Sequence, residues 1–417
     1  MKFSSHRFVF LISLVLITSC TPKARPTSAG PAGLAETVTP SSQRAVLVKP
    51  YDAIIDFPAA TSMALTTAGD SVYMILGREH SLYVSRSTDG GETFSDPVSA
   101  TGGHEVHILR VERPAISAND KGQVAVAWLE LDFEAGNNKV WYALSNDSGQ
   151  TFGSAQLVGE DPPGESAMVQ LLLDSAGNPM LTWLSGNDLR FARSTDQGKS
   201  FSAAKSIGQG ACECCQPDLM LTENQLLIGY RGLGNDESGA FRDAALIRSP
   251  DGGETFSPVS FATDSHWYIN ACPISGPSMA LHDSSIYMTW MDGRAVAPDN
   301  LLSSDVWFAE SADDGQTFSS NVQVSNGVST HNFLPKTAVG PAGRIHIAWQ
   351  AISPDAIYYA ISDDGGHTFS APLVIADEAA KRGRPAGPMI AINEQGRVFL
   401  AWLDDQGVQL AIWDDAN

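Results

Sequence analysis

The sequence is poor in basic residues, in cysteine and in long apolar runs. Its 26 Lys and Arg residues face 47 Asp and Glu residues, so the formal net charge is −21. Proteins hold nucleic acid or an anionic membrane surface with an excess of positive charge, so we expect neither as the main partner. Apolar residues at helical spacing are also scarce, while Gly and Thr are frequent. Both features favour an all-β fold.

The apolar run Phe8–Ile17 is too short to cross a bilayer. It follows Lys2 and Arg7, and a positive end before a short apolar run is typical of an export signal, here residues 1–19. The residues Ile17-Thr18-Ser19-Cys20 resemble a bacterial lipobox. The resemblance implies cleavage before Cys20 and lipidation of its thiol. An ordinary signal peptide is the alternative.

Residues 20–42 consist mainly of Pro, Ala, Ser, Thr and Gly. Such a segment buries too little apolar surface to fold, and we expect a disordered tether. Thr21 stands where an aspartate would signal retention in the inner membrane. The lipobox resemblance therefore favours an exported lipoprotein in the outer membrane of a Gram-negative bacterium, with the lipid as its membrane contact.

An eight-residue box, S-x-D-x-G-x-T-F, recurs six times along the chain with small variations. An aspartate followed by x-Gly suits a tight turn, because the carboxylate accepts backbone N–H bonds and glycine takes positive φ at little cost. We therefore expect each box to stabilise a turn between two strands rather than to catalyse a reaction. The box aspartates are Asp89, Asp147, Asp196, Asp251, Asp313 and Asp364.

A second repeat combines an apolar strand, usually led by proline, with a turn and an alternating strand that often ends in tryptophan. Each copy is followed by a third strand, a box and a fourth strand, which is the pattern of a β-propeller blade. The tryptophans, at the same place in each unit, are expected in the core between blades. The seven copies begin at Pro58, Pro114, Met168, Pro217, Pro277, Pro335 and Pro385.

The two ends of the body are incomplete in complementary ways. The seventh unit stops at Asp414-Asp415, before a fourth strand, while residues 44–49 form a strand without a blade of their own. Pairing these two would remove an exposed sheet edge. We therefore predict one domain over residues 43–417, a propeller of seven four-stranded blades closed by its N- and C-terminal strands. Six blades are the alternative.

The repeated boxes on four-stranded units resemble the sialidase superfamily, also called BNR or Asp-box repeat proteins. The resemblance covers nearly all of the chain after the tether. It implies that the boxes face away from the functional surface. That surface would be the mouth, formed by the loops that enter each innermost strand. Members of this superfamily include hydrolases and binding modules, so the resemblance is more specific for fold than for activity.

The mouth loops concentrate cysteine and histidine. Once Cys20 is set aside, four cysteines remain, in the segment Cys212-Glu213-Cys214-Cys215 and at Cys272. In an oxidising compartment two disulfides are the first interpretation, with at least one bond reaching Cys272. The alternatives are free or redox-active thiols, or a Cu(I) or Zn site that adds His104, His107 or His266. The C-x-C-C and C-P-x-x-G-P motifs also resemble a group of exported sialidase-like proteins.

The resemblance implies the groups that sialidase chemistry needs. Three arginines bind the carboxylate of the substrate, a Tyr activated by Glu is the nucleophile, and an Asp is the acid/base. Arginine suits the first task because its planar fork pairs bidentately with a carboxylate. The family's first arginine is absent, since Asp56-Phe57-Pro58 occupies that position. The candidates are Arg113, Arg231, Arg242 and Arg294, and structural ion pairs are the alternative for the last three.

Three functions follow as hypotheses. The leading one is a cell-envelope lipoprotein that binds a ligand, which is a glycan, a peptide or a metal, at the Cys-, His- and Arg-rich mouth. The first alternative is a glycoside hydrolase of the exo-α-sialidase type. The second alternative is an envelope protein that binds copper or zinc.

Overall fold

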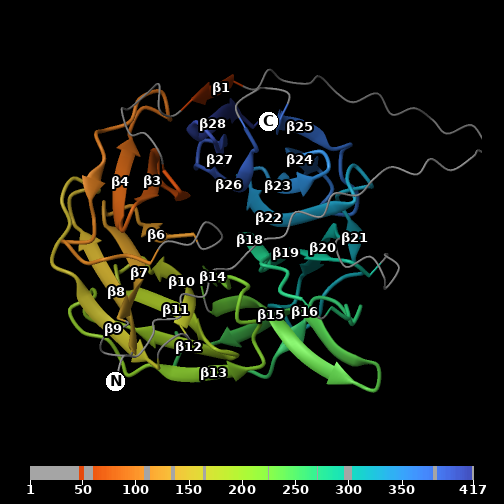
Figure 1. Cartoon of the computed structure of the whole chain (residues 1–417), viewed down its shortest axis with the longest axis horizontal. Helices are drawn as coiled ribbons and strands as arrows, with labels where there is room; N and C mark the ends of the chain where they lie inside the picture. The colour runs from red at the N-terminus through yellow and green to blue at the C-terminus, as the bar shows by residue number, and fades with distance from the viewer. Residues whose placement is uncertain are drawn as a thin grey trace, which may run out of the picture. The chain divides into compact units, whose positions relative to one another are not determined.

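Seven sheets of four antiparallel strands form a ring in the computed structural model, which confirms the predicted seven-bladed β-propeller (Figure 1). The structure describes residues 47–50, 60–107, 113–132, 137–162, 166–223, 225–269, 271–294, 303–378 and 383–415. The signal, the tether and Cys20 lie outside these residues. Within them there is no α-helix. Accordingly, this part of the chain contains no helix with the length and apolarity that a membrane crossing requires.

The innermost strands surround the central axis, and each contacts the innermost strands of the neighbouring blades. They are β2 (Ser62–Ala68), β6 (Ala115–Ala118), β10 (Ser166–Leu173), β14 (Asp218–Leu221), β18 (Ser278–His282), β22 (His331–Val339) and β26 (Ala386–Ile392). The second strands are β3 (Ser71–Arg78), β7 (Val124–Asp132), β11 (Pro179–Ser185), β15 (Leu226–Asp236), β19 (Ser285–Asp292), β23 (Ile345–Ile352) and β27 (Arg397–Asp404).

The third and fourth strands complete each blade toward the rim. The third strands are β4 (Ser81–Ser87), β8 (Asn137–Ser145), β12 (Asp188–Arg193), β16 (Gly239–Ser249), β20 (Asp305–Ser311), β24 (Ala356–Ser362) and β28 (Gly407–Asp414). The outermost strands are β5 (Val98–Ser99), β9 (Gln156–Asp161), β13 (Lys205–Gln209), β17 (Ser260–Phe261), β21 (Val322–Gln323), β25 (Leu373–Asp377) and β1 (Leu47–Pro50).

The last blade joins the two ends of the chain. β1 pairs antiparallel with β28, so that Leu47 lies opposite Ile412, and the strand order of this sheet is β1-β28-β27-β26. This is the predicted closure by terminal strands. It gives β28 a partner on the side where an edge would otherwise be exposed.

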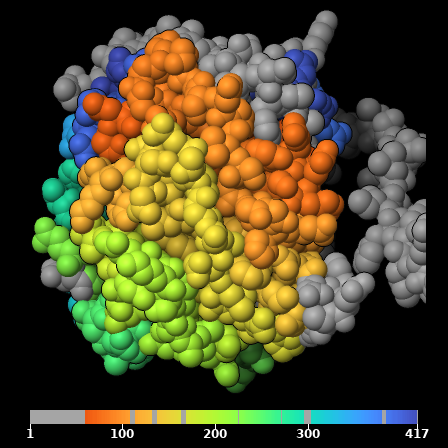
Figure 2. Space-filling view, turned by 90° about the vertical axis from the view of Figure 1, so that its left-hand side faces the viewer, coloured from red at the N-terminus to blue at the C-terminus, as the bar shows by residue number. Residues whose placement is uncertain are grey.

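The core lies between blades rather than inside any one of them. The second strands are buried on both faces, and Trp183, Trp290 and Trp349 are fully buried, which confirms their expected place in the core. The last and first blades share a cluster that includes Phe399 and Met74. In Figure 2 the surfaces of successive blades lie side by side in chain order. Each blade therefore depends on its neighbours to bury its apolar faces.

Alternating strand directions sort the loops onto two ends of the ring. The turns with the boxes connect the third and fourth strands at one end. The loops that enter the innermost strands lie at the other end, which we call the mouth. There, the long hairpin of β15 and β16 projects beyond the neighbouring strands (Figure 1). The cysteines lie in two mouth loops on either side of this blade.

Candidate functional site

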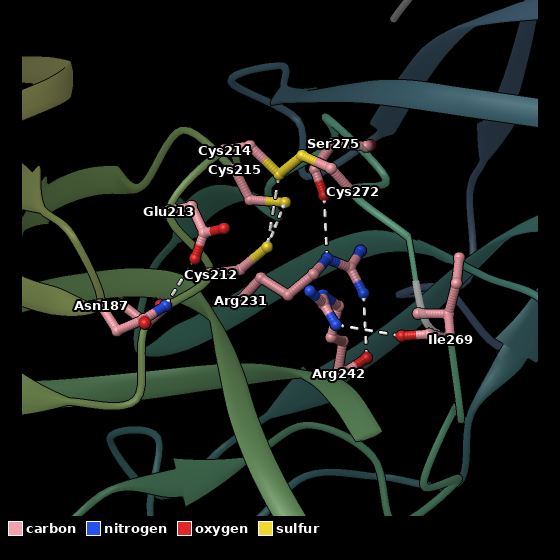
Figure 3. The surroundings of a disulfide bond; sticks show 11 residues. Asn187, Cys212, Glu213, Cys214, Cys215, Arg231, Arg242, Ile269, Cys272 and Ser275 are labelled. Carbon is pink, nitrogen blue, oxygen red and sulfur yellow. Dashed lines mark hydrogen bonds between the residues drawn. A yellow bond between two sulfur atoms is a disulfide. The ribbon is translucent and has the colours of Figure 1, made fainter. Parts of the chain in front are cut away.

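A disulfide ties two mouth loops together. It joins Cys214, between β13 and β14, to Cys272, between β17 and β18, with Cα atoms 6.3 Å apart (Figure 3). The bond confirms that one cysteine of the C-x-C-C segment pairs with Cys272. The two loops are in close contact, because a Cβ built on Gly276 would lie 1.8 Å from the carbonyl oxygen of Gln216. Only glycine permits this approach.

The other two cysteines are reduced, buried and adjacent. Cys212 and Cys215 form a C-x-x-C pair in which the Cys215 N–H bonds to the Cys212 carbonyl at 3.1 Å. This turn places their Sγ atoms 3.2 Å apart. Cys212 Sγ also lies 3.6 Å from Cys214 Sγ. The sulfur atoms of Cys212, Cys214 and Cys215 thus form one cluster, and that of Cys214 is part of the disulfide. The expected second disulfide is not formed in this structure.

Two arginines from β15 and β16 border the sulfur atoms (Figure 3). The Cys215 thiol donates to Cys212, and with Arg242 and the charge of Arg231 it lowers the pKa of Cys212 to about 6, against the effect of burial. Burial, with the neighbouring Cys212, raises the pKa of Cys215 well above its usual value. The pair therefore favours one thiolate, at Cys212, stabilised by one thiol.

The guanidinium of Arg231 is buried and hydrogen-bonded within the protein. It is 1% exposed and donates to the carbonyls of Ser275 at 2.9 Å, Arg242 at 3.1 Å and Met291 at 2.7 Å. These bonds connect three neighbouring segments around one buried guanidinium. Its positive charge lowers the pKa of both thiols, while its N–H groups donate to backbone carbonyls.

The remaining candidate arginines lie apart from one another. Arg294 pairs with Asp292, donates to Asn321 at 2.6 Å and lies over the Trp307 ring. Arg242 donates to the Ile269 carbonyl at 3.0 Å. Arg113 lies near the central axis, in a small cavity with Gln216 and Lys336. The structure therefore does not gather the four into a single carboxylate clamp.

The three candidate histidines are not part of the sulfur cluster. His104 Nδ1 lies 3.0 Å from Glu130 Oε2, and its ring packs against Trp141. His266 Nδ1 lies 2.9 Å from Asp236 Oδ2. His107 lines a cavity beside Arg113, and burial lowers its pKa. Among the described residues, the group with metal-binding geometry consists of Cys212, Cys214 and Cys215 alone.

The boxes form turn-stabilising networks at the end opposite the mouth. In one of them Ser145 Oγ donates to Asp147 Oδ1 at 2.7 Å, and the Thr151 N–H and hydroxyl donate to the same carboxylate at 2.9 and 2.6 Å. Hydrogen bonds from Thr151 and Ser145 lower the pKa of Asp147 to about 2. The other five boxes repeat these bonds. Their carboxylates are thus occupied and ionised at neutral pH.

Two features of the site were not found by sequence reasoning. One is the pair of ionisable side chains near the axis, Asp218 and Lys336, each directly after a strand-leading proline. The sequence did contain a signal for this pair, because a charged residue is unusual in an otherwise apolar innermost strand. The other is Tyr268, whose hydroxyl donates to Asp236 at 2.5 Å across the projecting hairpin. No local pattern predicts that contact, since the residues are far apart in sequence.

Comparisons with known proteins identify the fold. No family model matches the chain, and no curated protein matches it. Among solved structures, an ulvan lyase of a polysaccharide lyase family is 12% identical with a TM-score of 0.57, over 83% of this chain and 90% of that one. The α-L-arabinofuranosidase of Fusarium graminearum is 12% identical with a TM-score of 0.51, over 85% and 92%. At such identity these likenesses establish a shared propeller fold.

A Hadza microbial sialidase is also similar, with 14% identity and a TM-score of 0.47, over 82% of this chain and 76% of that one. The TM-score is too low to support an argument about activity. The evidence for the chemistry of this protein therefore comes from the residues of its own mouth loops.

Proposed function

We propose that this protein is an exported, lipid-anchored propeller whose mouth binds Cu(I) through Cys212 and Cys215. The observation that carries the proposal is the 3.2 Å separation of two reduced, buried thiols in a loop that a disulfide holds in place. Soft thiolate ligands select Cu(I), zinc and iron–sulfur clusters. The same pair supplies the thiolate that a metal requires.

The number of ligands favours copper over zinc. Zinc sites are almost always four-coordinate. Here the group with metal-binding geometry, within the described residues, consists of three cysteines, and Cys214 is already in a disulfide. The candidate histidines His104 and His266 are engaged with carboxylates elsewhere. Two thiolates satisfy Cu(I), which accepts low coordination numbers, whereas they leave zinc incomplete.

Charge also favours a monovalent soft cation. Two thiolates around Cu(I) carry one net negative charge, and burying it is costly unless a positive charge is near. Arg231 is a fully buried cation that interacts electrostatically with Cys212, and Arg242 lies beside it (Figure 3). Two of the arginines that the sialidase interpretation assigned to a substrate, Arg231 and Arg242, therefore serve in this proposal as counter-charges to the sulfur centre.

Anaerobic titration of the full-length protein with Cu(I), held in a competing chelator of known affinity, tests the proposal. We expect one Cu(I) per chain, and loss of that site in Cys212→Ser and in Cys215→Ser. Glu213→Gln is the matched control, because Glu213 lies in the same loop with an exposed side chain and should leave binding intact. Retention of copper by Cys212→Ser, or oxidation of all four body cysteines in protein purified from the envelope, would contradict the proposal.

The membrane address is a separate part of the proposal. It is supported by the apolar run, the lipobox and the composition of residues 20–42. Mass spectrometry of the N-terminal peptide should show a lipid on Cys20, and Cys20→Ser should release the protein from the membrane fraction. An unlipidated N-terminus, or unchanged fractionation of the variant, would contradict the lipid anchor and favour an ordinary signal peptide.

Glycan binding is the second candidate, and one observation favours it. Tyr268 is 42% exposed at the mouth, its hydroxyl bonds to Asp236, and the neighbouring His266 and Phe241 rings stack 4.1 Å apart. An exposed aromatic face beside a carboxylate suits a sugar. A glycan array with wild type and Tyr268→Ala tests this: binding that the variant retains would contradict it.

An exo-sialidase has less support than either candidate. Arg231 donates to three carbonyls, and Arg294 is bound to Asp292, so neither offers a free fork to a substrate carboxylate. Release of sialic acid from a sialoside by the purified protein, lost in Arg113→Ala, would reverse this ranking.

A further inference from the structure

The central axis holds three ionisable side chains from three alternate blades. Arg113 lies two residues before β6, Asp218 begins β14, and Lys336 lies within β22. They interact electrostatically with one another. One blade separates Arg113 from Asp218 and Asp218 from Lys336, and two blades separate Lys336 from Arg113, so the side chains converge on the axis rather than on one blade interface.

A small cavity lies between two of these residues, Arg113 and Lys336, at the mouth end of the axis. Gln216 directly follows the cysteine segment, and its side-chain amide donates to the Arg113 carbonyl at 3.0 Å, which fixes one wall. The cavity has room for about one water-sized species. Its lining residues are Arg113, Gln216, Ile274, Gly276, Leu334, Pro335 and Lys336.

The hydrogen bonds leave Arg113 short of a partner. Asp218 accepts the Met279 N–H at 2.7 Å and the Leu219 N–H at 3.0 Å, so both of its oxygens are bound to backbone. Arg113 Nη2 is buried and has no hydrogen-bond partner. Among the described ion pairs, none joins Asp218 to Arg113 or to Lys336. Two cations thus share a confined space with one carboxylate that is already occupied.

Such an arrangement is unfavourable as it stands. A charge removed from water is tolerated only when it is paired and hydrogen-bonded, and with all three groups charged the cluster carries one positive charge in excess. Burial, and then the charge of Arg113, lower the pKa of Lys336 to about 7, so the cavity favours the neutral amine unless a negative charge is near. Burial likewise lowers the pKa of Arg113 to about 10. A negative ion in the cavity would relieve both groups at once.

We propose that the axial cavity binds a small monovalent anion between Arg113 and Lys336. The excess of one positive charge sets the charge of the ligand, and the cavity size limits it to an ion comparable with water. Chloride and the carboxylate of a small organic acid share this chemistry. The site is distinct from the thiol pair and does not depend on copper binding there.

The ion also has a structural consequence at the mouth. Gln216 adjoins Cys215, and Gly276 belongs to the loop of Cys272, so the cavity wall is continuous with the loops that hold the sulfur atoms. An anion that stabilises Arg113 and Lys336 therefore stabilises the floor of the mouth. Its binding free energy adds to the stability of the folded chain, because the site does not exist in the unfolded state.

The test is thermal unfolding of the full-length protein at constant ionic strength, with sodium chloride or sodium formate replacing sodium gluconate. We expect chloride or formate to raise Tm saturably by about 2 °C or more, with gluconate inert because it is too large for the cavity. A rise with formate alone identifies a carboxylate site. A rise with chloride identifies a halide site. Equal Tm values in all three salts would overturn the proposal.

Variants of the lysine sharpen the result. Lys336→Met should lose the dependence on the anion, yet match or exceed wild type in gluconate, because it removes a partly buried cation without an ion-pair partner among the described residues. Lys121→Met, in an exposed turn, is the matched control and should keep the full dependence. Persistence of the anion effect in Lys336→Met would overturn the assignment.

If Lys336→Met does not fold, crystals of the wild-type protein soaked in bromide provide a second measurement. An anomalous peak between Arg113 and Lys336 supports the site when chloride was the effective anion. Its absence under those conditions overturns the site.

Discussion

The Sγ atoms of Cys212 and Cys215 lie 3.2 Å apart and are joined by a hydrogen bond rather than by a disulfide. The Cys214–Cys272 disulfide fixes the loop that holds them, while the hydrogen bond from Cys215, with Arg242 and the charge of Arg231, favours the thiolate at Cys212. In an oxidising compartment a pair this close has three possible states: a disulfide, a redox-active pair of thiols, or a pair held open by a ligand. The distinction decides whether the mouth is a structural crosslink or a binding centre.

Removing the disulfide should destabilise the propeller. Cys272→Ser frees a loop closed over 58 residues, for which chain entropy predicts a loss of about 4 kcal/mol. Urea unfolding followed by tryptophan fluorescence should show a lower midpoint. The double variant Cys214→Ser/Cys272→Ser should lose no more than the single one, since both lack the same bond. An unchanged midpoint in the two variants would mean that the crosslink is not formed in solution.

Arg231 should be one of the most sensitive arginines in the chain. Arg231→Met removes three hydrogen bonds to carbonyls in a site that is closed to water, and we expect a loss of at least about 3 kcal/mol. Arg384→Met is the control, because the side chain is 80% exposed and its ion pair with Asp355 is worth about 1 kcal/mol or less. Similar urea midpoints for the two variants would contradict the structural role of Arg231.

The boxes should make stability sensitive to acid. The pKa of Asp147 is lowered to about 2 in the folded protein, whereas an unfolded aspartate titrates near about 3.9. The unfolded state therefore binds protons first as pH falls, so the stabilisation is complete above about pH 4 and is lost toward pH 2. Tm measured across this range should fall on acidification. Asp147→Asn should lower Tm at pH 7 and show a smaller further loss on acidification.

The contact between the two mouth loops should not tolerate a methyl group. Gly276→Ala places a Cβ 1.8 Å from the Gln216 carbonyl oxygen, and overpacking of this kind costs about 1–3 kcal/mol. Gly153→Ala is the control, since the nearest atom would be at an ordinary 3.4 Å. Thermal unfolding should separate the two variants. Equal Tm values would show that the loops move apart without cost.

Repetition makes the fold of this chain predictable from its residues. Six boxes and seven strand units locate the strands, because each repeat is a local pattern of turn residues and alternation. The closure of β1 on β28 also followed from the sequence, since one end lacked a strand and the other had one to spare. The buried tryptophans, such as Trp183 and Trp290, were recognisable as core by their constant place in the unit.

The site was less predictable, because it depends on contacts between segments far apart in sequence. The sequence indicated that a cysteine of the C-x-C-C segment reaches Cys272, but which one, and whether the others pair, depended on the turn at Cys212–Cys215. Arg231 and Arg294 have the residue type of substrate-binding groups, and only their partners in the fold assign them a structural role. Lys336 was not recognised at all, because the direction of a side chain on an innermost strand is set by the ring.

By itself, the sequence determined the number of blades, the way the ring closes and the end on which the cysteine loops lie. These are properties of repeats, and short-range turn and strand preferences are enough to specify them. Only the tertiary structure decided that Cys212 and Cys215 remain a pair of thiols beside a disulfide, and that Arg113 and Lys336 meet on the axis. Such groupings arise when seven blades close into a ring and bring distant residues within bonding distance, which no local pattern encodes.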